Sequence, residues 1–332
     1  MNALNDKRSD LAESLLYYFC KLKLESDRKK TKISYAKGYE IGAQAYADLR
    51  TQFARDIFHK PPVLPLLKDG QTILDIGSGR GSSAIPLLEL PLDLKVFLTD
   101  PSESELNHAF NLKDRFKNKI GGIVCCKADH LPFEDETFDL VSLIDVMEHV
   151  IQWKQCLSEV YRVLKPSGFT YMQFPFLNNV SHAHLGDLVR FEHVELLWKK
   201  KTILAVYKRL AEEEVERSDI ERPDELRQWF EWHLEQHENW INRLMPSEFE
   251  EYVNNLGFSE FLSWFRPKEG YIPLLVRPIR PFHHLYTTCN FFILQKQTGK
   301  KLDIEKTIRH EAWETLKSRG KIKALKLLKN RQ

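Results

Sequence analysis

The amino-acid sequence predicts an α/β protein built on a seven-stranded, mostly parallel sheet with helices on both faces and one antiparallel strand. Between residues 72 and 174, apolar runs of strand length alternate with amphipathic helical patterns, as in consecutive βαβ units with right-handed crossovers. Two more strand-like runs, Ser259–Phe265 and Asn290–Lys296, follow close together later in the chain. Neighbouring runs of this kind favour an antiparallel edge, so they complete the predicted sheet.

The expected parallel strands are short, apolar and bounded by turn residues. They are Thr72–Ile76, Lys95–Leu98, Ile120–Cys126, Phe138–Ile144 and Phe169–Phe174. The expected helices between them carry apolar residues at three- and four-residue spacing. They are Ser82–Leu90, Ser102–Phe116 and Gln152–Leu164.

Helical additions surround this core. Helix breakers are few before Lys60, and the strand–helix alternation stops after Pro175, where long patterns rich in Glu, Arg and Trp begin. We therefore expect five parts. They are an N-terminal helical cap (1–60), the core (61–175), a helical insertion that forms a lid over the acceptor (176–245), the closing strands (246–299) and a basic helical tail (300–332).

The composition is that of a globular protein, with 42% apolar and 29% charged residues. No apolar run reaches the roughly 18 residues of a membrane span, and the first residues lack the apolar stretch of a signal peptide. The five cysteines are scattered without a C-x-x-C pair, which favours a reducing compartment and no zinc site. These features predict a cytoplasmic protein.

The net charge of +2 is unevenly distributed along the chain. Residues 1–60 carry +4 and residues 296–332 carry +8, which leaves −10 between them. The segment 300–332 is therefore expected to form a basic amphipathic helix. It can lie on an anionic membrane as a peripheral contact or dock on the acidic body of its own chain. The pattern gives no strong nucleic-acid signal, and it leaves the oligomeric state open.

A glycine-rich turn follows the first expected strand. Asp75 precedes a G-x-G-x-G series at Gly77, Gly79 and Gly81, and a helical pattern opens at Ser82. Glycines in a strand–turn–helix unit let the backbone approach a cofactor closely. The dinucleotide fingerprint requires glycine or alanine at the position of Ser82, and a pyrophosphate gains nothing from a nearby carboxylate. A ligand with an ammonium and a sulfonium does gain, so the turn favours S-adenosylmethionine (SAM) over NAD.

Carboxylates follow three expected strands in succession. Asp75 ends the first, Asp100 ends the second, and Asp129 follows the third. Any one of them alone is equally compatible with a turn or a helix cap. Ligands of open α/β sheets bind at the carboxyl ends of the strands, where these side chains would gather. Asp100 lies where ribose hydroxyls are expected, and Asp129 lies where an adenine amino group is expected.

With these motifs in order, the chain over about 71–174 resembles the class I SAM-dependent methyltransferases, especially the small-molecule branch of quinone biosynthesis. The matching segments are Ile73–Gly81, Asp129–Val141, Asp145–Val150 and Val163–Gly168. The resemblance implies a Rossmann-like sheet that binds SAM. The glycine turn would meet the methionine part, Asp100 the ribose and the Asp129 segment the adenine, with Asp145 beside the amino-acid part. The cofactor-binding positions so implied are Asp75, Gly77, Ser78, Gly79, Gly81, Asp100, Pro101, Asp129, His130, Leu131 and Asp145.

The implied reaction is in-line transfer of a methyl group to a small-molecule acceptor such as a sugar, a lipid-linked compound or a secondary metabolite. A hydroxyl acceptor needs a general base, and the candidates are His149, His182, His184 and His193. His182 and His184 also have the spacing to hold a metal with Asp187, or they belong to a polar lid without chemistry. We expect no metal.

Other functions remain compatible with parts of the sequence. The glycine turn also occurs in NAD-dependent oxidoreductases, and the basic tail would suit a nucleic-acid or protein methyltransferase. A binding scaffold without activity is a further alternative. Competitive binding of SAM and NAD separates the first alternative from the main hypothesis, and the sequence itself does not identify the acceptor.

Overall fold

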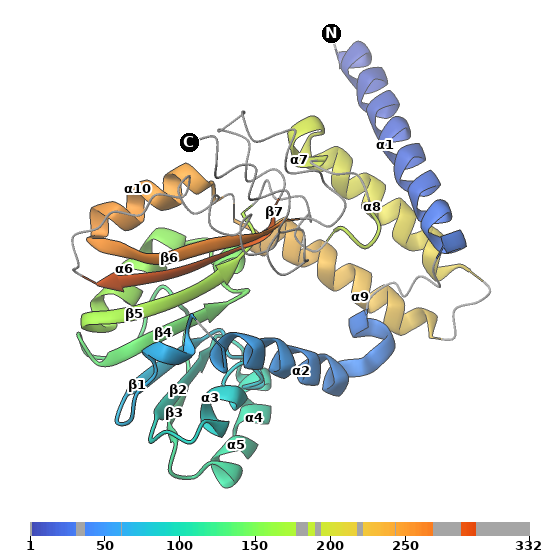
Figure 1. Cartoon of the computed structure of the whole chain (residues 1–332). Coiled ribbons are helices and arrows are strands. Elements are labelled where there is room, and N and C mark those ends of the chain that lie inside the picture. Colours follow the sequence, from blue (N-terminus) through green and yellow to red (C-terminus); the bar gives the residue numbers. More distant parts are fainter. Residues whose placement is uncertain are drawn as a thin grey trace, which may run out of the picture.

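The computed structural model describes residues 2–30, 37–60, 62–176, 185–189, 194–217, 222–242, 244–267 and 287–296. Its centre is a seven-stranded sheet with the order β3-β2-β1-β4-β5-β7-β6 (Figure 1). Strand β7 runs antiparallel to β5 and β6, while β1 to β5 are parallel. The predicted fold class is therefore confirmed. The strands are β1 (Thr72–Ile76), β2 (Lys95–Asp100), β3 (Ile120–Cys125), β4 (Phe138–Ile144), β5 (Leu164–Phe174), β6 (Phe258–Pro267) and β7 (Thr287–Lys296).

Helices cover both faces of the sheet (Figure 1). On one face, α6 (Trp153–Val163) and α10 (Pro246–Leu256) pack on the middle strands and on β6. On the other face, α2 (Lys37–Phe58), α3 (Ile85–Glu89) and α5 (Asn111–Arg115) supply apolar side chains to a second core. The remaining short elements of this region are η1 (Leu64–Leu66), α4 (Glu103–Ala109) and η2 (Met147–His149).

Two expected elements differ most from the observed ones. The single helix expected over 102–116 is divided at Phe110 into α4 and α5. The Lys113 N–H donates there to the carbonyl of Phe110, three residues earlier, which makes a tighter turn than the α-helical spacing of four residues. Strand β5 begins five residues earlier than expected, at Leu164 rather than Phe169, because its pairing with β4 continues through an irregularity opposite Phe138 and Leu140. Ser167 has a φ of +62° in this irregularity, which a periodicity argument does not anticipate.

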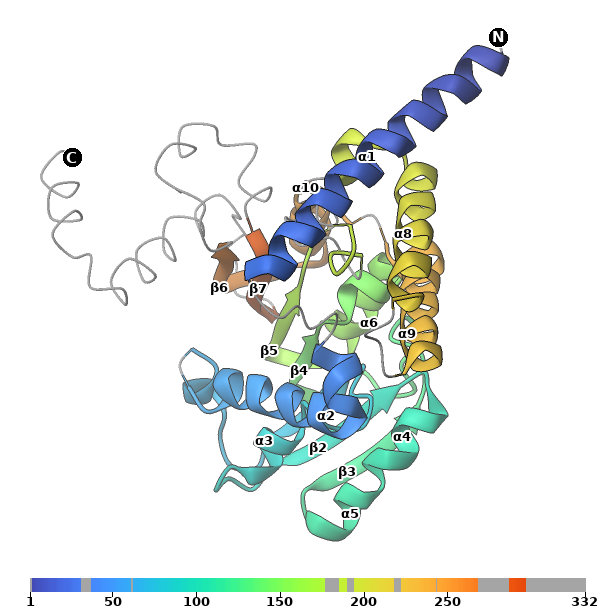
Figure 2. The same ribbon diagram turned by 90° about the vertical axis from the view of Figure 1, so that its right-hand side faces the viewer.

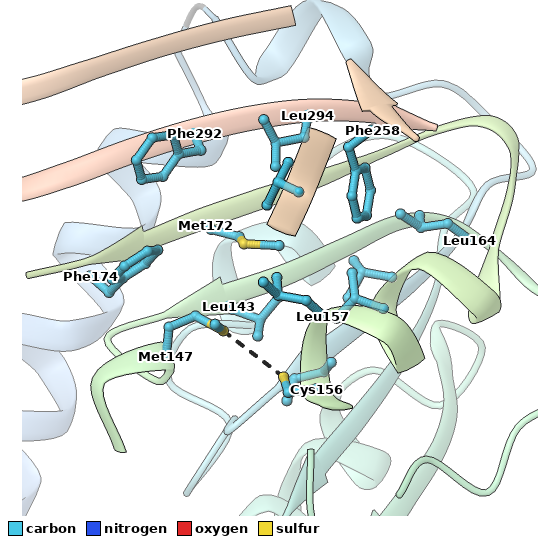
Figure 3. Close-up of a cluster of buried hydrophobic side chains, with 14 of the residues drawn as sticks. Leu143, Met147, Cys156, Leu157, Leu164, Met172, Phe174, Phe258, Phe292 and Leu294 are labelled. Carbon is cyan, nitrogen blue, oxygen red and sulfur yellow. Dashed lines mark hydrogen bonds between the residues drawn. The ribbon is translucent and has the colours of Figure 1, made fainter. Parts of the chain in front are cut away.

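The larger core lies between α6, α10 and the middle of the sheet (Figure 3). Phe174 of β5 is fully buried, with ring centroids of Phe176, Phe249 and Phe292 at 5.1, 5.3 and 5.6 Å. In the same core, the Cys156 thiol lies 3.9 Å from the Met147 sulfur (Figure 3). Strand β7 thus contributes to the core although it is far from β5 in sequence.

A third apolar cluster lies outside the sheet. It joins α1 (Asn2–Lys30) to the insertion helices α8 (Lys200–Val215) and α9 (Pro223–Glu235) (Figure 2). The two helices of the N-terminal segment therefore pack on different parts of the protein, α1 on the insertion and α2 on the sheet. The insertion also contains α7 (Val194–Leu197) and a short π-helical turn, η3 (Gln236–Trp240).

The tryptophans of the insertion do not form one buried face. Trp229 packs against the third cluster, whereas Trp232 and Trp240 are about half exposed. No helix in the described part of the chain is long and apolar enough to cross a membrane. The expected basic tail, 300–332, lies outside the described residues.

Replacement of Phe174 by alanine should lower the free energy of unfolding by about 3–5 kcal/mol, because it removes a fully buried ring from an aromatic cluster. Urea denaturation followed by circular dichroism measures the change. Phe110→Ala, at a ring that is 43% exposed, is the matched control and should cost far less. Equal costs for the two variants would show that the cluster around Phe174 is not a main source of stability.

Candidate functional site

The candidate site lies at the carboxyl ends of the central strands. Strand β1 has β2 on one side and β4 on the other, so the strand order reverses direction there. Crevices at such a reversal are the usual ligand sites of open α/β sheets. The glycine turn after β1 and the segments after β2, β3 and β4 all meet at this edge.

The glycine turn is crowded, and its backbone takes left-handed conformations. Gly77 has a φ of +68°, and a Cβ atom built there would lie 2.4 Å from the Val146 Cγ2 atom. At Gly81, with a φ of +83°, a Cβ atom would lie 2.5 Å from the Leu112 Cδ1 atom. The N–H of Ser78 donates to the Thr99 carbonyl of β2 at 2.9 Å, which fixes the turn to the neighbouring strand. Larger residues at Gly77 or Gly81 would displace the turn.

Asp75 is buried beneath the turn. Its side chain accepts hydrogen bonds from the hydroxyls of Ser83 and Ser142, both at 2.6 Å. Burial raises the pKa of Asp75 to about 6, although these two hydrogen bonds favour the ionised form. The carboxylate therefore lies under the expected methionine position with both oxygens engaged by the protein. Sequence reasoning identified Asp75 but missed the two serines.

Asp100 connects the turn to the segment after β2. One carboxylate oxygen accepts from the Gly79 N–H at 2.9 Å, and the other accepts from the Ser102 N–H at 2.8 Å. Burial raises the pKa of Asp100 above its ordinary value, and these backbone donors oppose the shift. The next residue, Pro101, is exposed. Asp100 is thus held in one orientation at the edge where the sequence predicted it.

The segment after β3 is held by two charged residues of α6. The Leu131 N–H donates to a Glu159 carboxylate oxygen at 2.8 Å, and Arg162 donates to the carbonyls of Leu131 and Phe133 at 3.0 and 2.7 Å. Asp129 is largely buried next to the exposed His130 ring, with 3.3 Å between the Asp129 Oδ1 and His130 Nδ1 atoms. The predicted adenine segment is therefore rigid, for a reason that local sequence patterns did not show.

Asp145 joins the site to a residue from outside the predicted core. It follows β4 with a φ of +53° and accepts a hydrogen bond from Gln173 Nε2 at 2.9 Å. The other oxygen forms an ion pair with Arg50 of α2. Arg50 also donates to the Ile144 carbonyl at 3.2 Å. The N-terminal helix α2 thus places a cation at the end of β4, which sequence reasoning missed.

The η2 turn beside Asp145 carries two buried ionisable side chains. Burial, together with the nearby Asp145, raises the pKa of Glu148 well above its ordinary value, and one Glu148 carboxyl oxygen, Oε2, is buried without a hydrogen-bond partner among the described residues. Burial lowers the pKa of His149 to about 4, so its ring is neutral at pH 7. Asn242, after η3, donates to the Met147 and Val150 carbonyls and fixes η2 to the insertion.

The other predicted bases, His182, His184 and His193, lie outside the described residues. Asp187, the third member of the metal alternative, accepts from the Leu188 N–H at 3.0 Å and from the Tyr207 hydroxyl at 3.4 Å. Within the described residues, no three His, Cys, Asp or Glu side chains group closely enough to hold a metal ion.

Comparison with known proteins agrees with this geometry. Residues 74–172 match the family model described as a methyltransferase domain. A ubiquinone/menaquinone biosynthesis C-methyltransferase, UbiE of Rickettsia prowazekii (strain Madrid E), is 32% identical over 130 residues, which are 36% of this chain and 49% of that protein. An uncharacterized protein of Methanocaldococcus jannaschii is 34% identical over 144 residues, which are 42% of this chain and 58% of that protein. The chain therefore spans only about half the length of the curated relatives it matches.

Two solved structures cover most of the chain at low sequence identity. A protein of Pyrococcus horikoshii OT3 has 19% identity and a TM-score of 0.45, covering 79% of this chain and 100% of that one. A protein described provisionally as a sarcosine dimethylglycine methyltransferase of Galdieria sulphuraria has 13% identity and a TM-score of 0.46, covering 80% and 92%.

Residues 74–172 are therefore a methyltransferase domain of the class I, Rossmann-like kind, whose cofactor is S-adenosylmethionine. The predicted resemblance to the quinone-biosynthesis methyltransferases is confirmed, since this part of the chain is similar to UbiE.

The buried carboxyl of Asp75 should make the stability of the ligand-free protein depend on pH. Its pKa rises from 3.8 to about 6 on folding, so the unfolded chain ionises first and the free energy of unfolding falls between about pH 4 and pH 6. The full loss is about 3 kcal/mol and persists above pH 6. Asp75→Asn lacks this penalty, so its stability relative to the unaltered protein should increase by that amount from pH 4 to pH 7.

Urea denaturation at several pH values measures this difference. The exposed Glu103→Gln variant is the control, and its stability relative to the unaltered protein should stay nearly constant with pH. A constant difference for Asp75→Asn as well would contradict the effect of burial on Asp75.

Proposed function

We propose that this chain is an enzyme that transfers a methyl group from SAM to a small-molecule acceptor. The observation that carries the proposal is the set of carboxylates around the glycine turn. Asp75, Asp100 and Asp145 end three neighbouring strands of a methyltransferase domain, and each has a defined hydrogen-bonded orientation. Such a set suits a cationic ligand with a ribose, and it opposes a pyrophosphate.

The residues present fit the cofactor part by part. Gly77 and Gly81 let the turn take left-handed conformations packed against Val146 and Leu112, so the turn would lie close against the protein beneath the methionine part. Asp100 would accept from the ribose hydroxyls, and the rigid segment Asp129–Leu131 would hold the adenine. Arg50 would bind the carboxylate of the methionine part. The bound cofactor supplies an activated methyl group on a sulfonium.

The acceptor should bind next to η2, because unused polar atoms are buried there. Glu148 Oε2 and Gln173 Oε1 have no hydrogen-bond partners among the described residues, and both side chains are less than a tenth exposed. Leaving such groups unpaired is costly, so an acceptor with a hydroxyl or amine is favoured. The insertion 176–245 would cover this site, since Asn242 fixes η2 from that side.

The similarity to UbiE supports a narrower class of acceptor. That relative is named as a C-methyltransferase of ubiquinone and menaquinone biosynthesis. We propose for this chain an electron-rich aromatic acceptor with a hydroxyl group. Glu148 would take the hydroxyl proton as the ring carbon attacks the methyl group, since burial makes its carboxylate a stronger base. The methyl–sulfur bond would break as the carbon–carbon bond forms, S-adenosylhomocysteine would leave, and loss of the ring C–H proton would restore the aromatic ring. Holding the ring in line with the methyl group provides most of the remaining rate enhancement.

The proposal is tested by incubating the protein with methyl-labelled SAM and a panel of dihydroxylated aromatic compounds, with and without an isoprenoid chain. Label should pass to a ring carbon of at least one compound. Binding of NAD without binding of SAM, measured by calorimetry, would overturn the proposal. Labelling of nucleic acid or protein in place of every small molecule would overturn the acceptor class.

Asp100→Ala should weaken SAM binding by about 1–3 kcal/mol, which is roughly 5- to 150-fold, because the ribose hydroxyls lose their acceptor. Isothermal titration calorimetry measures the dissociation constant. Glu103→Ala, an exposed carboxylate in the first turn of α4, is the control and should bind SAM normally. Unchanged affinity in Asp100→Ala would show that the ribose lies elsewhere.

Glu148→Gln should lower kcat by about 10²-fold or more, the usual contribution of a general base, while SAM affinity stays within a few-fold of the unaltered protein. The limb of the pH–rate profile on which activity rises with pH should also disappear, since glutamine does not titrate. A variant that retains both kcat and the pH profile would remove Glu148 from the mechanism and leave the histidines as candidates.

A further inference from the structure

Helix α1 has apolar side chains on two opposite faces. The inner face packs against α8 and consists of Leu16, Tyr17, Cys20 and Leu24, all buried. The outer face consists of Leu11, Leu15, Tyr18 and Leu22, which are 62, 48, 66 and 53% exposed. Phe19, 51% exposed, lies beside the outer face. A helix that needed only to pack on its own protein would be apolar on one side and polar on the other.

The outer residues have the spacing of a coiled coil. The steps from Leu11 to Leu15, Tyr18 and Leu22 are four, three and four residues, which is the heptad pattern that lets two helices pair along a seam. The inner residues fall at the heptad positions that point away from such a seam. Both views show α1 at the periphery, with its N-terminal half extending beyond α8 (Figures 1 and 2).

The outer face cannot be buried by rotating α1, because the inner face is fixed. The Tyr17 hydroxyl and the Lys21 ammonium both donate to the carboxylate of Glu213 on α8, at 2.5 and 2.9 Å. The Arg209 guanidinium also lies 3.6 Å from the centre of the Tyr17 ring. These contacts hold the exposed stripe in its outward orientation.

We propose that the outer face of α1 pairs with the same face of a second copy of this chain, in an antiparallel, two-fold symmetric arrangement. The spacing is self-complementary in that orientation. Leu11 of one copy lies opposite Leu22 of the other, and Leu15 lies opposite Tyr18. On the flank of the seam, Phe19 then falls near Ala12 of the other copy, a small residue that leaves room for its ring.

The exposed area is sufficient for a specific dimer. Five large side chains that are about half exposed provide on the order of 500 Å² per copy, or roughly 1,000 Å² in total, which reaches the lower limit of specific interfaces. A dimer of modest affinity is therefore expected.

The first test measures mass against concentration by analytical ultracentrifugation of the full chain. The unaltered protein should form a dimer that dissociates on dilution. Leu15→Glu should raise the dissociation constant at least about 100-fold, because it buries two like charges, one from each copy, in the seam. Leu197→Glu is the matched control, since Leu197 is a leucine on α7 with 64% exposure, and it should dimerise normally. An unaltered protein that stays monomeric, or equal effects of both variants, would overturn the proposal.

The second test fixes the orientation and does not depend on a destabilising charge. In a Cys125→Ser background, which removes an exposed thiol, Leu11→Cys and Leu22→Cys proteins are mixed and oxidised. The mixture should form a disulfide-linked pair, and neither protein alone should do so. A link between two Leu11→Cys copies would overturn the antiparallel arrangement. Binding of monomers to lipid vesicles that Leu15→Glu abolishes would assign the stripe to a membrane and overturn the dimer.

Discussion

The site depends on one buried carboxylate with two hydroxyl partners. Asp75 lies at the end of the central strand, opposite Ser142 of β4 in the sheet register, and it also binds Ser83 after the glycine turn. Removing a carboxylate from water is costly, and the two short hydrogen bonds offset part of that cost. These two hydrogen bonds fix the turn to β1 and, through Asp75, to β4. The Gly79 N–H of this turn donates to Asp100, so the turn also helps to orient the next acidic residue.

Parts of the chain outside the matched domain complete this edge. Arg50 comes from α2, before the domain begins, and Asn242 comes from the end of the insertion. Both attach to the segment between Asp145 and Val150. That segment therefore receives constraints from the sheet, from the N-terminal helix and from the insertion. The insertion is therefore connected to the site through η2.

The sequence predicted what local patterns determine. The bounds of β1 and β4 were predicted to the residue, and Asp100 lies at the expected strand end, because apolar runs and the glycine turn are local signals. The early start of β5 was missed, since Ser167 and Gly168 resemble a turn while the strand continues through them. The Arg50–Asp145 ion pair was missed for a different reason. It joins residues 95 positions apart, and no periodicity links an arginine on one helix to a carboxylate after a distant strand.

The Arg50–Asp145 pair also gives the site a consistent charge balance. Without a ligand, each charge neutralises the other in a partly buried position, and Gln173 supports Asp145. The methionine end of SAM is itself a zwitterion, with an ammonium and a carboxylate. Inserted between the two side chains, it would present the ammonium to Asp145 and the carboxylate to Arg50, so one ion pair becomes two and both charges of the zwitterion are paired. A pyrophosphate would match Arg50 but would oppose Asp145 and Asp75. This balance follows from Arg50 on α2, Asp75 on β1 and Asp145 after β4, and it favours the same cofactor as the glycine turn.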